Sequence, residues 1–366
     1  MTERRRFIVT GSGALAAVAA AAIVDAPHVI AQPKIQWRMS TTWTQALDVH
    51  QGAAQRLSKI VEELSGGRFR IEVFPAGQIM KAFECFEAAS RGTIEAFMGC
   101  SYYWTAQTNE PAVEWFTTVP FGMNAEGMGA WYASGDGLKL WEETYAPFNL
   151  VPRPGPGIAP QMAGWFRKKI NTISDYKGLR MRIPNLGGKV ITRAGGTSVL
   201  TPGADIYAAL ERGVIDAAEW IGPHDDMTLG LHRTARYYYY PGWHEPGTTT
   251  EFGFNKKAYE ALPVDLQRTL DHAVAAVDVY GHRDHHAKNA IALERLKTEF
   301  KGKVELHLLP TPVLRDLKKL AGEVIRAESE KTPTVRKVSA SFTRFQALVG
   351  PWDHVAESAY QQFVRA

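Results

Sequence analysis

Several features that mark particular classes of protein are scarce or missing in this sequence of 366 residues. Its formal net charge is only +4, so the chain lacks the basic excess with which a protein binds nucleic acid. No internal repeat and no low-complexity segment is visible, which gives no support to a repeat architecture. Beyond residue 31 no apolar run has the length of roughly 20 residues that a bilayer span requires.

Cysteine is also scarce, with Cys85 and Cys100 as the only two. They could close a short loop as a disulfide in an oxidising compartment, and two buried free thiols are an equal alternative. Neither has a histidine or a second cysteine at metal-ligand spacing, so we assign them no chemistry. The motifs GxSxG, HExxH and GxxxxGK[ST] are missing as well, which removes the local signatures of serine hydrolases, zinc proteases and P-loop enzymes.

Aromatic residues are abundant, with ten Trp, thirteen Tyr and sixteen Phe. Rings shape and dry ligand pockets, although most of them in a chain of this size build the core. The fractions of 45% hydrophobic and 22% charged residues are ordinary for a soluble globular protein of two domains.

The N-terminus has the pattern of a targeting segment. An arginine cluster, Arg4–Arg6, precedes an Ala-rich apolar stretch at residues 13–24. Together with Phe7, the paired arginines look like a twin-arginine export signal, which carries proteins that have already folded. We therefore expect residues 1–31 to be removed and the mature chain to reach a bacterial periplasm. An uncleaved N-terminal anchor is the alternative.

The remaining chain alternates strand patterns with helix patterns, which predicts mostly parallel sheets covered by helices. The expected strands are Lys34–Ser40, Arg68–Phe74, Ile94–Ser101, Gln161–Arg167, Leu179–Ile183, Thr248–Phe254 and Val304–Leu309. The expected helices include Ala46–Ser65, Lys81–Arg91, Gly127–Tyr145, Gly187–Ala194 and Val264–Phe300.

Two places look like crossings between domains. Val151–Gly157 is the densest cluster of breaker residues, and Thr248–Phe254 reads as a strand that returns to the first domain. The predicted division is a signal at 1–31, a first domain at 32–155 with a return segment at 250–310, an inserted second domain at 156–249, and a helical C-terminal region at 311–366. Two connections make a hinge with a cleft, so we predict an α/β bilobed binding-protein fold of the type II kind with long C-terminal helices.

The stretch from Asp205 to Glu245 is the centre of the prediction. A short helix with Thr201 as its N-cap ends at Gly213, and an apolar run then leads directly to Glu219 and Trp220. A buried strand that delivers a carboxylate and a large ring at its C-terminal end is where open α/β sheets bind ligands.

Four motifs resemble those of the solute-binding proteins of TRAP transporters, and their order matches that family over nearly the whole mature chain. They are Pro75–Ile79, Lys177–Pro184, Gly213–Trp220 and the strand that leads into Phe254-Asn255-Lys256. The Glu219-Trp220 pair, Gln161 and Ser101–Trp104 are most similar to the branch that binds 2-oxo acids or lactate together with a metal ion.

The resemblance implies that Arg182 holds the carboxylate of the substrate. Its guanidinium presents two parallel donors, which match a carboxylate in a fork-to-fork pair. Arg180 lies on the opposite face of the strand by the period of two, and we expect solvent around it. A surface ion-pair role is the alternative for Arg182.

The resemblance also implies a metal ion between Gln161, Glu219 and the backbone carbonyl of Trp220, with the ligand bridging it to Arg182. Glu245 falls where the family has a further polar residue that touches the metal or the substrate. Hard cations such as Na⁺ or Ca²⁺ take carboxylate, amide and carbonyl oxygens, and two carboxylates favour a divalent ion. An exposed loop charge is the alternative for Glu245.

Tyr103 and Trp104 are implied to close one wall of the pocket and to supply a hydroxyl to the ligand. Both could equally be core aromatics at the end of a strand, and for Trp104 the two readings have equal weight. The ring of Trp220 could pack over the ligand while its carbonyl serves the metal.

The predicted function is an exported receptor that is not an enzyme. It binds a small monocarboxylate, a 2-oxo acid such as pyruvate or else lactate, with Na⁺ or Ca²⁺, and delivers it to the TRAP membrane permease. The alternative is a periplasmic metal-dependent lyase or hydrolase with Glu219 or His244 as general base. His224, Asp225 and Asp226 could form an acid/base group in such an enzyme, but we expect them to cap the next helix.

The C-terminal region at 311–366 contains two long amphipathic stretches, with apolar residues such as Leu317, Val324, Phe342 and Trp352. They could pack on the receptor's own body. Because the branch that the chain resembles includes dimers built from such helices, we expect part of this region to pair with a second copy in a homodimer.

Overall fold

Two separate β-sheets organise the chain in the computed structural model, which describes residues 34–364. Residues 35–366 form one compact unit, and the fold below is that of this unit. The predicted export signal lies outside the described residues. None of the described helices combines the length and the apolar character that a membrane span requires.

The first sheet has five strands in the order β2-β1-β3-β10-β4. Their bounds are β1 (Ile35–Thr41), β2 (Phe69–Phe74), β3 (Ala96–Gly99), β4 (Leu150–Ile158) and β10 (Thr248–Asn255). β1 pairs in parallel with β2 and β3, whereas β10 runs antiparallel between β3 and β4. The strand predicted at Thr248–Phe254 therefore does return to the first sheet.

The second sheet has six strands in the order β11-β9-β5-β8-β6-β7. Their bounds are β5 (Gly164–Phe166), β6 (Arg180–Arg182), β7 (Thr197–Val199), β8 (Ala217–Ala218), β9 (Tyr237–Tyr240) and β11 (Glu305–Leu308). β11 pairs with β9, so the end of the segment 250–310 lies in the second sheet. The sequence analysis had assigned this whole segment to the first domain. The long helix that precedes β11 carries the chain from one sheet to the other.

The breaker cluster at Val151–Gly157 is a strand rather than a connection. It forms most of β4, which lies at the edge of the first sheet. Proline is tolerated there because the missing N–H groups at Pro152, Pro154 and Pro156 face no further strand. The predicted crossing between domains would therefore have to follow the end of this strand at Ile158.

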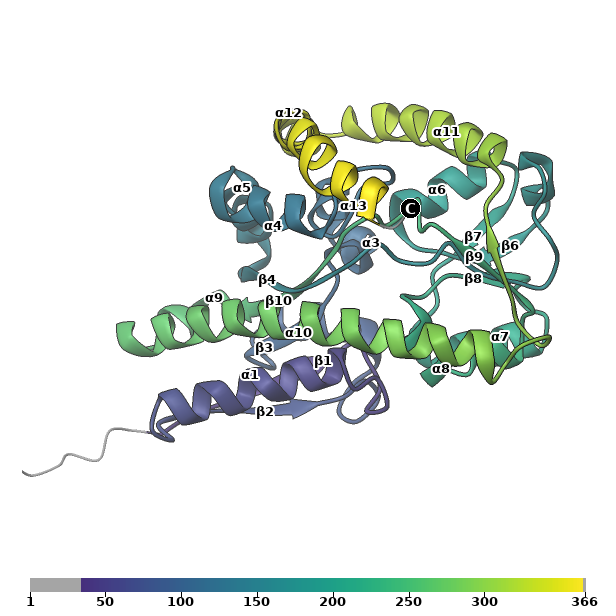
Figure 1. The fold of residues 1–366 in the computed structure, drawn as a ribbon. Helices are drawn as coiled ribbons and strands as arrows, with labels where there is room; N and C mark the ends of the chain where they lie inside the picture. Colours follow the sequence, from purple (N-terminus) through teal and green to yellow (C-terminus); the bar gives the residue numbers. More distant parts are fainter. Residues whose placement is uncertain (1–33, 365–366) are drawn as a thin grey trace, which may run out of the picture. The chain divides into compact units, whose positions relative to one another are not determined.

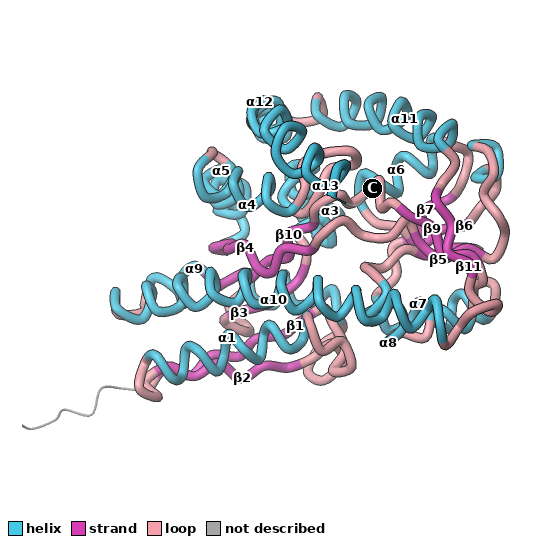
Figure 2. Tube along the Cα trace, viewed as in Figure 1, coloured by secondary structure: helices cyan, strands magenta, loops and turns pink. Residues whose placement is uncertain are grey.

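Helices cover both sheets, as the ribbon shows (Figure 1). The bounds are α1 (His50–Leu64), α2 (Cys85–Ser90), α3 (Thr105–Thr108), α4 (Ala125–Ser134), α5 (Gly137–Tyr145), α6 (Asn185–Arg193), α7 (Gly203–Glu211), α8 (Pro223–Thr228), α9 (Lys256–Glu260), α10 (Val264–Thr298), α11 (Thr311–Ser329), α12 (Pro333–Asp353) and α13 (Ala359–Val364). Separate helical and strand layers around two sheets confirm the predicted α/β class (Figure 2).

Two sets of helices connect the layers of the two sheets. The 35-residue helix α10 packs on β4 and α1 beside the first sheet and on α8 beside the second (Figure 1). On the other side of the unit, α11 packs on α6, and α12 packs on α4 and α5. The long C-terminal helices therefore cover this chain's own body along most of their length.

Tertiary packing determines the surroundings of the two cysteines and of the four consecutive tyrosines Tyr237–Tyr240. Cys85 and Cys100 are both buried and free, which excludes the disulfide alternative in this structure. Within β9, the consecutive residues Tyr238 and Tyr239 are both buried, because this inner strand is covered on both faces.

Trp104 belongs to the core beneath the first sheet and not to a pocket wall. Its indole N–H donates to the buried carboxylate of Glu251, and its ring stacks on Phe86 with centroids 5.2 Å apart. The hydroxyl of Tyr145 donates to the other oxygen of Glu251 at 2.9 Å. These contacts support the core interpretation of Trp104, one of the two that the sequence left open.

Burial raises the pKa of Glu251 to about 8, although the bonds from Trp104 and Tyr145 act in the opposite direction. The native state therefore favours the protonated carboxyl group, and its stabilisation is complete below the unfolded pKa and declines as the pH rises towards 8.

Glu251→Gln imitates the protonated form at every pH. Between pH 5 and pH 8.5 we expect the free energy of unfolding of the variant to rise relative to the native protein by on the order of 1 kcal/mol or more. Urea denaturation at both pH values measures this difference, and Glu72→Gln on the exposed surface is the control. A difference that does not depend on pH would show that Glu251 is charged in the core.

Candidate ligand- and metal-binding site

Strand pairing in the second sheet brings the predicted site residues to one edge. β6 and β8 are parallel, with Arg182 opposite Ala218, so the end of β6 lies beside Glu219 and Trp220. β5 runs antiparallel to β8 and β9, and its start therefore meets their ends. This places Gln161 beside Glu245, and the N–H of Gln161 donates to the carbonyl of Glu245 at 3.1 Å.

Arg182 is the centre of the group, and only 1% of it is exposed. Its Nη1 pairs with the carboxylate of Glu219 and also donates to the Glu219 carbonyl at 3.1 Å. Its Nε donates to the carbonyl of Thr201 at 3.1 Å, and its guanidinium carbon lies 4.9 Å from the ring centroid of Trp220. A buried ion pair, a backbone contact and a cation–π contact thus fix the guanidinium.

Two more polar side chains extend the group around Glu219. His244 Nε2 lies 3.1 Å from the second carboxylate oxygen of Glu219. Ligand atoms of Glu219, His244 and Glu245 all lie within 4.8 Å of one another, and all three residues are buried. The alternative interpretation of Glu245, as an exposed loop charge, is therefore wrong.

Gln161 and Thr248 orient Glu245. Gln161 Nε2 donates to Glu245 Oε2 at 2.7 Å, and the hydroxyl of Thr248 donates to the same oxygen at 2.6 Å. Because the amide nitrogen of Gln161 is used in this way, its oxygen Oε1 is left without a partner among the described residues.

The electrostatics of the group follow from burial. Burial and the neighbouring charge of Glu219 raise the pKa of Glu245 to about 7, against the opposing effects of His244, Thr248 and Arg182. Burial also raises the pKa of the Tyr102 and Tyr103 hydroxyl groups, with Glu219 and Glu245 among the contributing charges. Both hydroxyl groups therefore stay neutral and keep their protons as potential hydrogen-bond donors.

Four buried polar atoms of the group have no hydrogen-bond partner within residues 34–364. They are Nη2 of Arg182, Oε1 of Gln161, Nε1 of Trp220 and Nδ1 of His244. A buried polar atom without a partner costs about 1–3 kcal/mol, so four of them in one place indicate a site prepared for a ligand. Three offer N–H donors or an imidazole nitrogen, and the fourth offers an amide oxygen.

The donor set fits a metal ion. Two carboxylates and an unsatisfied amide oxygen are the oxygen ligands that hard cations such as Na⁺ and Ca²⁺ prefer. Gln161, Glu219 and Glu245 would supply these atoms, and the carbonyl of Trp220 lies on the same chain segment as Glu219. A bound cation would there provide positive charge and open coordination positions.

The structure assembles most of the predicted site and adds residues that the sequence analysis did not include. Gln161, Arg182, Glu219, Trp220 and Glu245 come together, and Tyr103 faces their charges. Tyr102, Thr201 and Thr248 were missed, and His244 was considered only as a general base. The sequence offered one indication that His244 belongs to the site, which is its position directly before Glu245.

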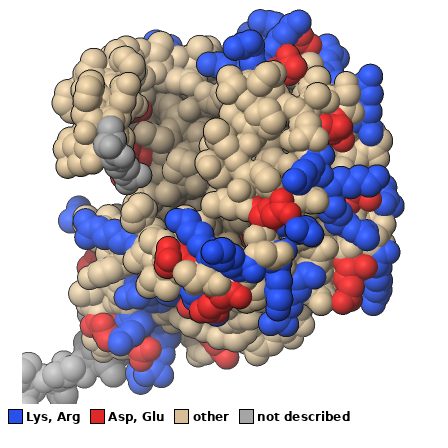
Figure 3. Space-filling model, turned by 45° about the vertical axis from the view of Figure 1, so that its right-hand side comes forward, with Lys and Arg blue, Asp and Glu red and all other residues tan. Residues whose placement is uncertain are grey.

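Surface cavities of about 570 and 550 Å³ lie elsewhere, the first between the α4–α5 connection and α12 and the second near His232. The side chains of the candidate site line neither of these cavities, because they are almost fully buried. The space-filling view shows a hollow near the C-terminal end whose walls carry few charged side chains (Figure 3).

Arg182→Met should destabilise the ligand-free protein strongly. The change leaves Glu219 buried without its cation, which typically costs 3–5 kcal/mol, whereas Arg182→Met combined with Glu219→Gln removes both charges and should recover most of the loss. Urea denaturation of the chelator-treated mature protein measures both effects. The control is Arg180→Met, which removes an exposed partner of Asp216. If Arg182→Met and Arg180→Met were equally stable, the account of the buried ion pair would be contradicted.

Comparison with known proteins supports the same reading. The family model described as bacterial extracellular solute-binding protein, family 7, matches residues 39–331. A monocarboxylate 2-oxoacid-binding periplasmic protein of Nostoc is 37% identical over 331 residues, which cover 90% of this chain and 89% of that protein.

Two solved structures are similar over nearly their whole length. A TRAP transporter solute-binding protein of Bordetella bronchiseptica, a dimer with copurified calcium and picolinate, is 35% identical with a TM-score of 0.87 over 90% of this chain and 97% of that one. A second, from Pseudoalteromonas atlantica with bound sodium and pyruvate, is also 35% identical with a TM-score of 0.87, over 90% of this chain and 99% of that one. The fold is thus the bilobed fold of these receptors, and the chain belongs to family 7 of the bacterial extracellular solute-binding proteins, the receptors of TRAP transporters.

Proposed function

We propose that this receptor captures a small 2-oxo monocarboxylate, such as pyruvate, together with a sodium or calcium ion and delivers it to a TRAP permease. The observation that carries the proposal is the buried group of Arg182, Glu219 and Glu245, with its four unpartnered polar atoms. Glu219, His244 and Glu245 are the one group of three metal-ligating side chains found in the described part of the chain.

Arg182 is the residue that would hold the ligand's carboxylate. Its Nη1 and Nε are occupied, but Nη2 is buried and free to donate. The ring of Trp220 lies against the same guanidinium and limits where a ligand can enter, while Tyr103 offers a neutral hydroxyl. These contacts would orient a carboxylate and exclude water from it.

Charge balance supports a cation beside a monocarboxylate. Arg182 contributes one positive charge, and ionised Glu219 and Glu245 contribute two negative charges. A divalent cation and one ligand carboxylate bring this sum to zero. With a monovalent cation the sum is zero when Glu245 keeps its proton, and its pKa of about 7 makes that state accessible. Relatives with calcium and with sodium are consistent with both combinations.

The proposed ligand class rests on the relatives and on the charge balance of the site. The Nostoc relative is a 2-oxoacid-binding protein, and the Pseudoalteromonas relative holds pyruvate. These two relatives are 37% and 35% identical to this chain. Lactate differs from pyruvate only in the 2-oxygen, so it belongs in the same test.

We also propose the organisation in which this site works. Two domains, built around the two sheets, close on the ligand by a hinge motion in the periplasm. The division falls after β4 and before β10, near the boundaries 156 and 249, and export follows the twin-arginine route through residues 1–31. Closure would strengthen binding because ligand contacts differ between the open and closed states.

Thermal unfolding of the mature protein with a panel of carboxylates tests the function. At pH 8, pyruvate with calcium should raise the unfolding midpoint by several degrees, since a ligand at 100 times its Kd stabilises by about 2.7 kcal/mol. A chelator should remove most of this shift, and sodium should restore part of it.

Two variants sharpen this test. Arg182→Lys should lose the shift because a single ammonium cannot replace the guanidinium fork, whereas Arg180→Lys, exposed and paired with Asp216, should keep it. If no 2-oxo or 2-hydroxy acid shifts the midpoint under any of these conditions, the proposed ligand class is wrong.

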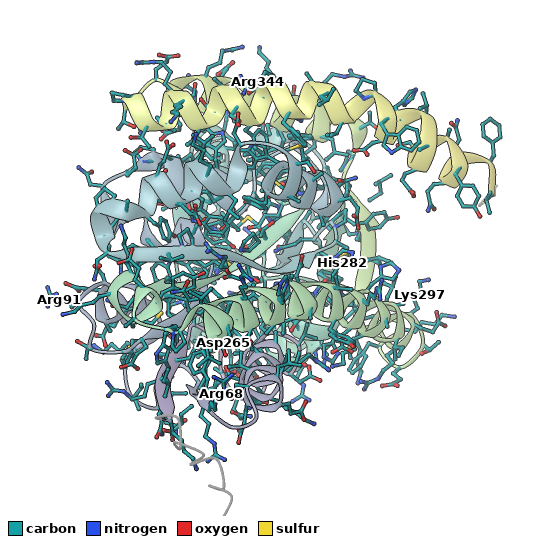
Figure 4. All side chains as sticks on the ribbon, turned by 90° about the vertical axis from the view of Figure 1, so that its left-hand side faces the viewer. Arg68, Arg91, Asp265, His282, Lys297 and Arg344 are labelled. Atoms are coloured by element: carbon teal, nitrogen blue, oxygen red, sulfur yellow. The ribbon has the colours of Figure 1, made fainter. Side chains whose placement is uncertain are left out.

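We propose in addition that the receptor is a homodimer through the end of its C-terminal helices. Leu348, Trp352, Val355 and Phe363 are each at least 65% exposed, and their spacing of three, four and eight residues places them along one side of the helical segment. Figure 4 shows this end projecting with its side chains free, beyond the Arg344 label. An apolar stripe of this kind is typical of an interface, and the Bordetella relative is a dimer.

Sedimentation at micromolar concentration tests the dimer. The native mature chain should sediment as a dimer and Trp352→Ser with Phe363→Ser as a monomer, because the two rings supply most of the exposed apolar area. Leu64→Ser, an exposed apolar residue at the end of α1, is the control. A native chain that is monomeric at this concentration would refute the homodimer.

A further inference from the structure

Three helices meet at a buried cluster of two histidines and one aspartate. His50 Nδ1 of α1 lies 3.6 Å from Asp225 Oδ1 of α8, and His285 Nε2 of α10 lies 3.3 Å from Asp225 Oδ2. All three side chains are at most 3% exposed. The first interpretation of Asp225 as a helix cap was wrong, because α8 begins at Pro223 and its N-cap is Gly222.

The neighbouring carboxylate of Asp226 faces the other way. It accepts hydrogen bonds from Nε1 of Trp165 in β5 and from the hydroxyl of Tyr238 in β9, both at 2.8 Å. It also accepts the backbone N–H of Ile221 at 3.0 Å. Asp226 therefore attaches α8 to the second sheet, while Asp225 attaches the same helix to α1 and α10.

These two attachments lie directly beside the ligand site in the chain. α8 follows Glu219 and Trp220 after only two residues, Ile221 and Gly222. The carbonyl of Ile221 accepts the N–H of Met162 at 3.1 Å, next to Gln161. A side chain added at Gly222 would approach Asn289 of α10 to 2.9 Å, so this connection lies tightly against the long helix.

α1 belongs to the layer of the first sheet, since it packs on β2, and α10 packs on β4 of that sheet. The His50–Asp225–His285 cluster is thus a direct contact between the first lobe and the segment that carries Glu219 and Trp220. His285 lies three residues after His282, which Figure 4 labels on α10 together with Asp265 and Lys297.

We propose that Asp225 is a positioning residue for ligand capture: its contacts with His50 and His285 hold the Glu219-Trp220 segment against the first lobe, and protonation of His285 releases it. The part that concerns the ligand rests on the proposed function. The attachment itself is a property of the ligand-free protein and can be tested without any ligand.

The charged groups around the cluster belong to the same three helices and the chain before α1. Asp48 accepts from His224 Nε2 at 2.6 Å and from Lys288 Nζ at 2.9 Å, and Lys288 also pairs with Asp284. Asp226 and the amide of Asn289 complete the surroundings, with Asn289 Nδ2 3.1 Å from the ring nitrogens of His285. The exposed pairs among them are screened by solvent, which leaves the buried His285 as the responsive group.

The direction of the pH effect follows from burial. Burial lowers the pKa of His285, and Asp225 only partly offsets this effect. Burial alone would raise the pKa of Asp225, but its contacts with His285 and His50 lower it, so the carboxylate stays charged. Neutral His285 is therefore favoured while the helices are in contact. When α8 moves away and water enters, the pKa of His285 returns towards 6.5, so separation takes up protons and acid favours it.

His285→Gln and Asp225→Asn separate this role from a merely structural one. Gln places a neutral N–H donor near the position of Nε2 and cannot take a proton, so the contact should persist at all pH values. Asn removes the charge that both histidines contact. Asp48→Asn, which changes an exposed carboxylate on the same surface, is the matched control.

Small-angle scattering of the ligand-free mature protein is the first measurement. The radius of gyration of the native protein should increase between pH 7.5 and pH 5.5, that of His285→Gln should not, and that of Asp225→Asn should be larger already at pH 7.5. Asp48→Asn should follow the native protein. A radius that is independent of pH in the native protein, or an identical response in His285→Gln, would overturn the proposal.

Calorimetric titration of pyruvate at pH 7.5 with calcium is the second measurement. Asp225→Asn should bind about tenfold more weakly, a typical coupling between distant sites, while His285→Gln should stay within about threefold of the native protein. If Asp225→Asn binds as tightly as the native protein, Asp225 has no positioning role. If the native protein binds no carboxylate, the proposed function fails, and the scattering measurement alone decides the role of the cluster. If Asp225→Asn does not fold, His285→Gln still tests the pH response.

Discussion

The buried ion pair between Arg182 and Glu219 is the interaction on which the rest of the site depends. Two charges removed from water are tolerated only when each is compensated in close geometry. Glu219 receives this compensation from Arg182 on one oxygen and from His244 on the other. Glu245 has no cation of its own, and its carboxyl group depends on Gln161 and Thr248. The group therefore holds an excess of acceptors for a cation and an unused donor edge on Arg182 for an anion. A receptor for a carboxylate and a metal ion follows from this imbalance.

The fold explains how residues from four distant segments reach one place. Arg182 and Glu219 end two parallel neighbouring strands, and the antiparallel strand β5 brings Gln161 to the same edge. Glu245 follows β9 by five residues and is fixed by the backbone of Gln161. On the far side of Trp220, the short helix α8 divides its two carboxylates between the lobes, with Asp226 on the second sheet and Asp225 between α1 and α10. The ligand site and the contact between lobes are thus neighbours in sequence as well as in space, which gives closure a direct mechanical path.

Sequence analysis predicted the parts that depend on local pattern and on motifs. The strand at Arg180–Arg182, the left-handed Gly213 after α7 and the position of Glu219 and Trp220 directly after β8 were all predicted from periodicity and residue type. It failed where tertiary pairing decides. The prolines of β4 read as a linker until the edge position of the strand is known. Trp104 is adjacent to Tyr103, yet its indole is used by Glu251, 147 residues away. His50 and Asp225 are separated by 175 positions, and no local pattern connects them. The assignment of individual site residues to metal or ligand remains a prediction.

A crystal structure of the mature protein grown with calcium and pyruvate tests the central claim most directly. The account predicts one anomalous-scattering peak between the carboxylate oxygens of Glu219 and Glu245 and Oε1 of Gln161. The pyruvate carboxylate should lie against Arg182, with Nη2 as a donor, and the same crystals grown with a chelator should lack both features. A calcium ion bound away from these three residues, or a pyruvate carboxylate that does not contact Arg182, would contradict the account.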